Sequence, residues 1–308
     1  MSLHGAPLAL AIDIGGTKVD AALVDSDGLV QRASVSRRPT GRAASRDEIA
    51  RAIRDASASA LSHVPASRSV AGIGVGSAGP VDLPGGSISP LNLPAAHGLV
   101  LAEVLVGLVA DAPVTLALDG TCIALAEHSY GALVGCETAL AMVVSTGVGG
   151  GFIAHGRAVG GASGNAGHIG QIRVRTLDAS DPAASSLEAI AAGPATVAWA
   201  CAQGWTGTTG EELGAAYRAG DEVARRAVIR SATAVGEAIT TAATLYDLEA
   251  VAVAGGFVQV ADDYLDHVRA SAHSAALHPY ARAVRISPSA LDGDGPLIGA
   301  AALVWQGI

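Results

Sequence analysis

The chain has 308 residues, of which 50% are hydrophobic and 15% charged, and its mean hydropathy is +0.41. This length suffices for one large or two medium cores. The net charge of −9, without any Lys/Arg cluster, argues against a nucleic-acid partner. The three cysteines form no CxxC pair, no apolar run is long enough to span a membrane, and residues 1–7 lack a signal-peptide pattern. We therefore expect a cytoplasmic protein that binds neither nucleic acid nor membrane.

The first informative stretch is an apolar run at residues 8–12 that ends in Asp13-Ile-Gly-Gly-Thr-Lys18. The run predicts a buried strand. Glycines let backbone N–H groups approach an anion closely, and a neighbouring hydroxyl and ammonium group suit phosphate oxygens. Asp13 suits Mg²⁺ held through water. The simpler alternative is an ordinary hairpin turn, in which Lys18, the chain's only lysine, lies on the next strand and acts only as a long-range charge.

The first half is predicted to begin with a three-stranded antiparallel meander and to continue with α/β units. Asp27 and Gly28 mark a hairpin turn, and Ser45 with Glu48 forms a capping box that predicts the start of a helix. Expected strands cover residues 8–12, 18–24, 29–36, 69–75 and 114–118, and a further helix is expected at residues 99–109.

The second half repeats this order. A strand at 139–144 ends in Ser145-Thr-Gly-Val-Gly-Gly-Gly151, and short strands follow at 152–154 and 157–159. Expected helices cover 121–130, 221–245 and 296–305, and a strand at 250–254 ends at Gly255 and Gly256. Two such glycine-rich turns facing one ligand suit an ATP-dependent phosphotransferase, because phosphoryl transfer depends mainly on positioning and electrostatics.

These motifs resemble the ROK family of sugar kinases, including its glucokinase-like and N-acyl-hexosamine kinase-like members, from about Leu8 to the C-terminus. The resemblance implies an α/β fold of the duplicated actin-like ATPase type (ribonuclease H-like, hexokinase-type), with two domains around a cleft. We expect an N-terminal domain of residues 1–118 plus 296–308 and a larger C-terminal domain of residues 119–295. It also implies ATP and Mg²⁺ as cofactors, a sugar substrate and a homodimer.

The resemblance assigns roles to residues that match the family motifs. Asp119, at the C-terminal end of an expected strand, falls on the catalytic base. The implied nucleotide-binding residues are Asp13, Gly15, Gly16, Thr17 and Lys18 in the first phosphate motif, Thr146, Gly147 and Gly149 in the second, and Gly255 and Gly256 on the adenosine side. The implied sugar-binding residues are Gly79, Asn92, Asp119, His168, Gln171 and Glu188.

Three positions depart from the family pattern. Leu118 replaces an Asn, His168 replaces a sugar-binding Glu, and Gln171 replaces a His that binds both sugar and a structural zinc. Residues 175–186 also lack the zinc-binding cysteines, so we expect no zinc site. Because a hydrogen-bonding mismatch in a buried site costs on the order of 1–3 kcal/mol, we expect glucose to be a poor substrate compared with a modified hexose or amino-sugar derivative.

The predicted function is ATP-dependent phosphorylation of a hexose or hexose derivative at the C6 hydroxyl, with Asp119 as general base. One alternative is a degenerate sugar-binding protein without kinase activity; the intact nucleotide motifs argue against it. Another is a different phosphoryl donor such as polyphosphate, which Gly255 and Gly256 on the adenosine side disfavour. The family's repressors carry an N-terminal winged helix; because the first strand is expected to begin near Leu8, we expect no such segment and no direct DNA binding.

Overall fold

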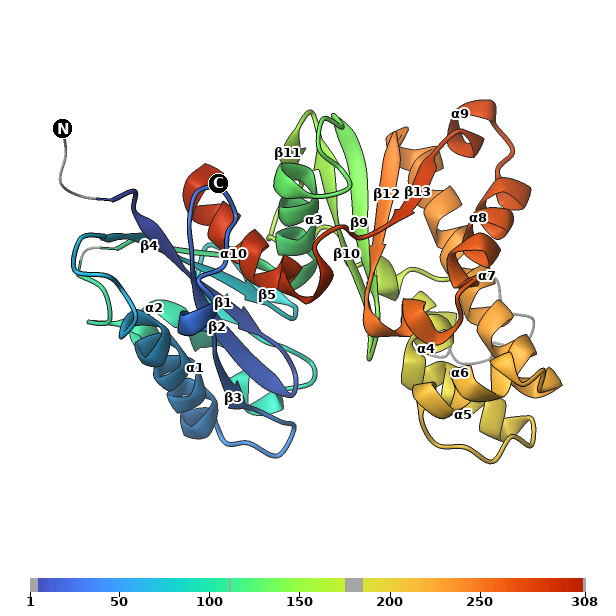
Figure 1. The fold of residues 1–308 in the computed structure, drawn as a ribbon, viewed down its shortest axis with the longest axis horizontal. Coiled ribbons are helices and arrows are strands. Elements are labelled where there is room, and N and C mark those ends of the chain that lie inside the picture. The colour runs from blue at the N-terminus through green and yellow to red at the C-terminus, as the bar shows by residue number, and fades with distance from the viewer. Residues whose placement is uncertain (1–4, 111, 175–184, 307–308) are drawn as a thin grey trace. The chain divides into compact units, whose positions relative to one another are not determined.

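A computed structural model describes residues 5–110, 112–174 and 185–306. The chain forms two compact units (Figure 1). The first comprises the described parts of Met1–Val134, Ala158–Gly167 and Leu291–Ile308, and the second comprises those of Gly135–Arg157 and His168–Ala290.

The first unit is built on a sheet with the strand order β3-β2-β1-β4-β8. The first three strands are antiparallel, and β4 and β8 run parallel to β1. Nearly every residue of β1 is buried, as expected for a central strand covered on both faces. The strands are β1 (Leu8–Ile14), β2 (Lys18–Val24), β3 (Ser36–Pro39), β4 (Val70–Ser77) and β8 (Val114–Leu118). A small antiparallel sheet adds β5 (Val81–Asp82), β6 (Ser87–Ile88) and β7 (Leu99–Val100).

Helices cover the larger sheet of the first unit. They are α1 (Arg46–Leu61), α2 (Leu101–Leu105), α3 (Asp119–Tyr130) and α10 (Gly295–Gln306). The predicted capping box is confirmed, because the Ser45 side chain accepts from the Glu48 N–H while the Ser45 N–H donates to Glu48 Oε2 at 2.8 Å. Helix α10 lies directly on β4, where a Cβ on Gly74 would stand 1.8 Å from the Ala300 carbonyl oxygen.

The second unit repeats the plan of the first, with the strand order β11-β10-β9-β12-β13. Its strands are β9 (Thr138–Val144), β10 (Val148–Ala154), β11 (Arg157–Ala158), β12 (Ala250–Ala254) and β13 (Arg285–Pro288). Its helices are α4 (Leu187–Ala191), α5 (Gly193–Ala202), α6 (Gly210–Arg218), α7 (Glu222–Tyr246), α8 (Tyr264–Ala275) and α9 (Pro279–Arg282). In both units an antiparallel hairpin precedes parallel strands. The expected duplicated α/β fold is confirmed.

Two elements expected in the first half were wrong in extent, and the strand expected at 152–154 begins earlier, at Val148, as β10. Residues 29–36 do not form one strand; Val30 makes an isolated bridge to Val24, and a 3₁₀ helix at Arg32–Ser34 precedes β3. There the buried Ser34 hydroxyl accepts from the Leu23 N–H at 2.8 Å, replacing a bond that a strand would supply. The helix expected at 99–109 is limited to α2, and Gly107 follows it with a positive φ of 75°.

The boundaries of the units differ from those expected at residues 118 and 296. Helix α3 and the chain up to Val134 belong to the first unit, because α3 packs along α10 and against β4. The short segment Ala158–Gly167 also belongs to the first unit.

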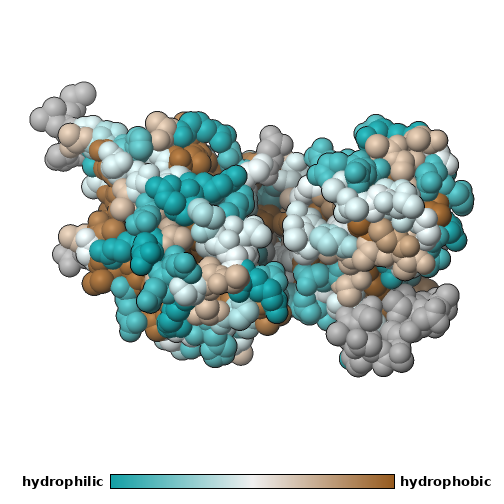
Figure 2. All heavy atoms as spheres, turned by 90° about the horizontal axis from the view of Figure 1, so that it is seen from below, coloured by the Kyte–Doolittle hydropathy of each residue, from teal (hydrophilic) through white to brown (hydrophobic). Residues whose placement is uncertain are grey.

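The surface drawn in Figure 2 is mostly hydrophilic or intermediate in hydropathy, and hydrophobic residues occur there in small groups. Within the described ranges, none of the helices combines the length and apolar composition needed to cross a bilayer.

Candidate functional site

Two carboxylates meet in the first unit around a glycine. Asp13, near the end of β1, lies opposite Gly76 of β4 in the sheet register. Asp119 is the first residue of α3, directly after β8, and a Cβ on Gly76 would lie 3.8 Å from its Cα. Both acidic residues therefore lie near Gly76, where strands β4 and β8 end, and the atom that a Cβ on this glycine would meet first is Cys122 Sγ, at 3.0 Å.

Asp13 is strongly perturbed by this setting. Burial raises its pKa from 3.8 to about 7, and the negative charges of Asp119 and Asp20 act in the same direction. Lys18 and Arg37 oppose the shift without cancelling it. A cation brought to this carboxyl group would favour its ionised form. Asp13 therefore has the chemistry of a group that gives up its proton when a cation binds.

Asp119 is held by its own helix. Its Oδ1 accepts from the Gly120 N–H at 2.7 Å, and its place in the first turn of α3 favours a negative charge. Behind it, burial and the charges of Asp13 and Asp119 raise the pKa of the Cys122 thiol well above its ordinary value. Cys122 is therefore a neutral packing group beside the two carboxylates.

Lys18 lies on the strand and not in the glycine turn. It is the first residue of β2, and its Nζ lies 2.9 Å from Asp20 Oδ2. Arg37 on β3 binds the same carboxylate through two nitrogens, at 2.6 and 2.9 Å. Burial alone would raise the pKa of Asp20, but hydrogen bonds from Arg37 and Lys18 outweigh it and lower that pKa. The Lys18 ammonium group is thus paired with Asp20, beside the predicted phosphate turn. Its place on the strand is the one given in the alternative in which Lys18 acts only as a long-range charge.

The turn at Gly15 and Gly16, predicted to bind phosphate, lies against Asn92, which is predicted to bind sugar. The Gly15 N–H donates to the Lys18 carbonyl at 2.9 Å, which closes the hairpin, and Thr17 is exposed. A Cβ on Gly16 would lie 2.8 Å from the Cβ of Asn92. Gly16 is therefore required for the close approach of Asn92.

Replacing Gly16 with alanine is expected to raise the KM for sugar about tenfold, because the added methyl group displaces Asn92. Steady-state kinetics with sugar varied at saturating nucleotide measures this effect. Gly41→Ala is the matched control, since a Cβ there meets nothing within 4 Å. An unchanged KM for sugar in Gly16→Ala would contradict the role given to this contact.

In the second unit, Glu188 joins the other glycine turn to the predicted sugar segment. Its Oε2 accepts from the Val148 N–H at 2.9 Å, and its Oε1 accepts from the Gln171 side chain at 3.3 Å. A Cβ on Gly147 would lie 2.6 Å from Glu188 Oε2. His168 immediately precedes the 3₁₀ helix Ile169–Gln171, which packs against β10. Gln171 and Glu188, both predicted to bind sugar, therefore lie together, and Glu188 also contacts the turn predicted to bind phosphate.

The remaining glycines of the predicted nucleotide motifs differ in their surroundings. Gly255 has a φ of +109°, and a Cβ there would stand 2.2 Å from the Val144 carbonyl oxygen. It accordingly serves the tight turn after β12. A Cβ on Gly149 would meet no atom within 4 Å, so packing does not demand a glycine there.

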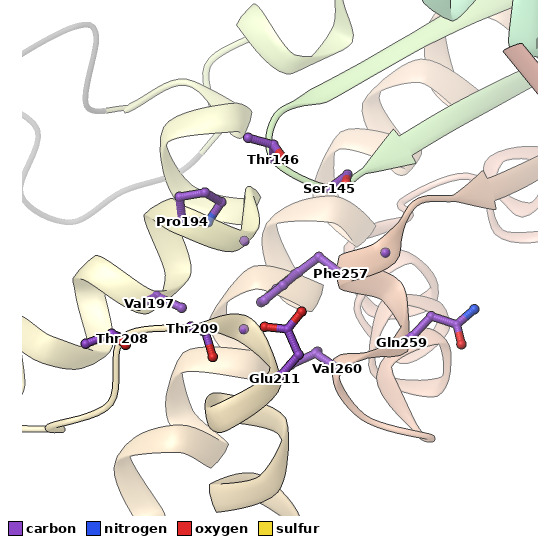
Figure 3. A pocket seen from close by; sticks show the side chains of 13 residues that line it. Ser145, Thr146, Pro194, Val197, Thr208, Thr209, Glu211, Phe257, Gln259 and Val260 are labelled. Carbon is purple, nitrogen blue, oxygen red and sulfur yellow. The ribbon is translucent and has the colours of Figure 1, made fainter. Parts of the chain in front are cut away.

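A cavity of about 540 Å³ lies in the second unit, beside the turn between β9 and β10 (Figure 3). Thr146 and Gly256 of the predicted nucleotide motifs line it. Figure 3 shows the Phe257 ring in the pocket with the Glu211 carboxylate beside it. The remaining lining residues are Ser145, Gly193, Pro194, Val197, Thr208, Thr209, Gly210, Gln259 and Val260. Apolar walls with a few polar groups suit a flat heteroaromatic ring carrying polar substituents.

Most of these pocket residues were missed from the sequence. They come from α5, the start of α6 and the 3₁₀ helix Gly256–Val260. The available signal was the capping box of Thr209 and Glu212, which marks the start of α6. It predicts a helix end but not a ligand.

The segment in which the family's zinc cysteines would fall lies almost wholly outside the described residues, which exclude 175–184. Within residues 5–110, 112–174 and 185–306, no three His, Cys, Asp or Glu side chains are grouped to hold a metal ion.

Comparisons with known proteins agree with this arrangement. A model of the ROK family matches residues 9–307. The N-acetylmannosamine kinase of Escherichia coli O157:H7 is 34% identical over 304 residues, covering 96% of this chain and 97% of that protein. Two crystal structures are similar over 97% of this chain. One is a ROK hexokinase from Thermus thermophilus, with a TM-score of 0.82, 28% identity and 98% of that chain covered. The other is a ROK family glucokinase from Streptomyces griseus in complex with glucose and AMPPNP, with a TM-score of 0.80, 26% identity and 99% of that chain covered. The chain therefore belongs to the ROK family and is a sugar kinase.

Proposed function

We propose that this kinase transfers the γ-phosphoryl group of ATP to the C6 hydroxyl of an N-acylated hexosamine, with N-acetylmannosamine as the preferred substrate. The observation that carries the catalytic part is the position of Asp119 at the start of α3, beside Asp13 around Gly76. A base and a cation-responsive carboxyl group at one sheet edge are what hydroxyl attack on a nucleotide phosphate requires.

In the proposed reaction, Asp119 accepts the proton of the sugar hydroxyl as that oxygen bonds to the γ-phosphorus, while the bond from the γ-phosphorus to the bridging oxygen breaks and ADP leaves. The Gly120 N–H orients this carboxylate by donating to its Oδ1 at 2.7 Å. Asp13 would hold Mg²⁺ through water, and the metal ion would neutralise developing phosphate charge. The backbone of the Gly15-Gly16 turn would bind phosphate oxygens, while Thr146 and Gly256 would serve the nucleotide from the second unit.

The choice of an N-acylated sugar rests on two observations. The relatives that cover nearly the whole chain at about one-third identity are named N-acetylmannosamine kinase, such as the one from Escherichia coli O157:H7 at 34%. In addition, Leu118, His168 and Gln171 alter the sugar side of the family pattern. In Gln171 an amide replaces an imidazole, and its carbonyl oxygen can accept an N–H from an acylamino group.

A sugar panel tests the proposal. Each sugar is assayed with ATP and with polyphosphate, and the position of the phosphate on the product is determined by ³¹P NMR. The panel contains N-acetylmannosamine, N-acetylglucosamine, mannosamine, mannose and glucose. We expect kcat/KM with ATP to be at least about 100-fold higher for N-acetylmannosamine than for glucose, with phosphate on O6. A preference for glucose would refute the substrate assignment. Sugar binding without transfer from either donor would favour a binding protein.

We also propose that the protein is a homodimer, on the basis of family membership. Sedimentation velocity at micromolar concentration should give twice the monomer mass of 30.3 kDa. A single species of monomer mass at that concentration would contradict this.

A further inference from the structure

A compact glycine loop, residues 160–167, lies between β11 and His168. Three of its glycines have positive φ angles: Gly161 at 71°, Gly164 at 90° and Gly167 at 103°. The Ala166 N–H closes the loop by donating to the Gly160 carbonyl at 3.1 Å. The loop therefore has a defined conformation, and it belongs to the first unit, whereas the chain that follows it from His168 belongs to the second.

The loop presents one side chain, Asn165, to the backbone of Val81. The Val81 N–H donates to Asn165 Oδ1 at 2.8 Å, and Asn165 Nδ2 donates back to the Val81 carbonyl at 2.7 Å. Asn165 Nδ2 also lies 3.1 Å from the Ser163 hydroxyl. A side-chain amide has the donor and acceptor of a peptide group, so Asn165 replaces a neighbouring strand residue along β5.

This pairing occurs where the small sheet has an edge. In the order β5-β6-β7, β5 has a strand partner on one side only. Asn165 forms hydrogen bonds with both the N–H and the carbonyl of Val81 on that strand. Val81 is only 5% exposed. Next to it, a Cβ on Gly164 would stand 2.3 Å from Leu83 Cγ, so the loop backbone lies directly against the chain after β5.

Val81 lies in the sequence between two predicted sugar residues, Gly79 and Asn92. Two residues earlier, the Gly79 carbonyl accepts from the Leu91 N–H at 3.3 Å. Asn92, which follows Leu91, contacts Gly16 of the phosphate turn. A continuous series of contacts thus runs from Asn165 through Val81 and Gly79 to Asn92.

We infer that Asn165 is a positioning residue for the sugar: through its two bonds to Val81 it holds the segment 79–92 so that Gly79 and Asn92 present their polar groups to the substrate. This inference rests on the proposed function for the identity of the sugar side. It gives Asn165 no contact with substrate and no part in proton transfer.

Asn165→Asp is the most informative variant. An ionised aspartate still accepts from the Val81 N–H but cannot donate to the Val81 carbonyl, whereas a protonated one can donate again. At pH 8 we expect the KM for N-acetylmannosamine to rise about tenfold, with kcat and the KM for ATP within about twofold of wild type. Ser163→Ala, which removes only the Ser163 hydroxyl contact of Asn165, is the matched control and should resemble wild type.

A second measurement does not depend on turnover. In Asn165→Ala, hydrogen exchange of the backbone amides in residues 81–92 should accelerate relative to wild type, while the thermal midpoint changes little. A wild-type KM for sugar in Asn165→Asp at pH 8, or a parallel change in both KM values, kcat and thermal midpoint, would overturn the inference. If wild-type protein phosphorylates no sugar, the proposed function fails, and the exchange experiment still decides whether Asn165 orders this segment.

Discussion

Replacing Asp119 with asparagine is expected to lower kcat about 10³-fold and to leave the KM values for sugar and ATP within about threefold of wild type. The asparagine Oδ1 can still accept from the Gly120 N–H, so the start of α3 should keep its structure. What is lost is a basic oxygen that can take the hydroxyl proton. Single-turnover assays with the preferred sugar, together with calorimetric sugar binding, separate the chemical step from binding.

Asp55→Asn, an exposed carboxylate-to-amide change on α1, is the control for the loss of one negative charge. It should have wild-type kinetics. If Asp119→Asn keeps more than about a tenth of wild-type kcat, another group serves as the base. If sugar binding is lost together with kcat, Asp119 acts mainly as a ligand of the sugar.

Replacing Asp13 with asparagine is expected to stabilise the nucleotide-free protein at pH 8, while activity falls. The pKa of Asp13 is about 7 in the folded protein, compared with 3.8 as its ordinary value. Between these pH values the folded state binds more protons than the unfolded state. The free energy of unfolding therefore falls as the pH rises from about 4 to about 7, by up to about 4 kcal/mol, and stays lowered above that pH.

Asparagine cannot ionise, so the variant escapes this loss. Its thermal midpoint should exceed that of wild type by more than about 5 °C at pH 8 and by little at pH 4, as measured by calorimetry without nucleotide. Asp55→Asn should move neither value. A difference of equal size at both pH values would mean that packing, and not ionisation, causes the change. The expected result would make Asp13 a residue kept for function at the expense of stability.

Much of the fold could be predicted because its signals are local. Neighbouring residues predict the Ser45–Glu48 capping box, strand β2 and the long helix α7. The capping box formed as expected, and the ends of β2 and α7 lie within one residue of the predicted ones. The strand expected at 29–36 failed because a buried hydroxyl, that of Ser34, supplies a backbone partner that no periodicity reveals. Helix α3 was assigned to the wrong unit because its packing on α10 joins segments far apart in the chain.

In the candidate site, too, local motifs could be predicted from the sequence and contacts between side chains could not. The glycine motifs and Asp119 could be found from the sequence because backbone access to phosphate requires glycine, and because the motifs resemble a known family. The pairing of Asp20 with both Lys18 and Arg37 could not be found, since Arg37 reaches this carboxylate from the neighbouring strand β3. The same holds for Phe257 and Glu211, which reach one cavity from separate helices.

The sequence by itself therefore determined the repeated α/β plan and the two glycine turns. It also predicted a catalytic carboxylate at Asp119 and an altered sugar side at Leu118, His168 and Gln171. Tertiary structure alone decided which groups those residues meet: Asp13 beside Asp119, Glu188 on the second turn, and Asn165 on Val81 across 84 positions of sequence. The physical reason is range. Turn, cap and strand preferences act over a few residues, whereas burial, charge coupling and side-chain hydrogen bonds depend on distances that exist only after the sheets have formed.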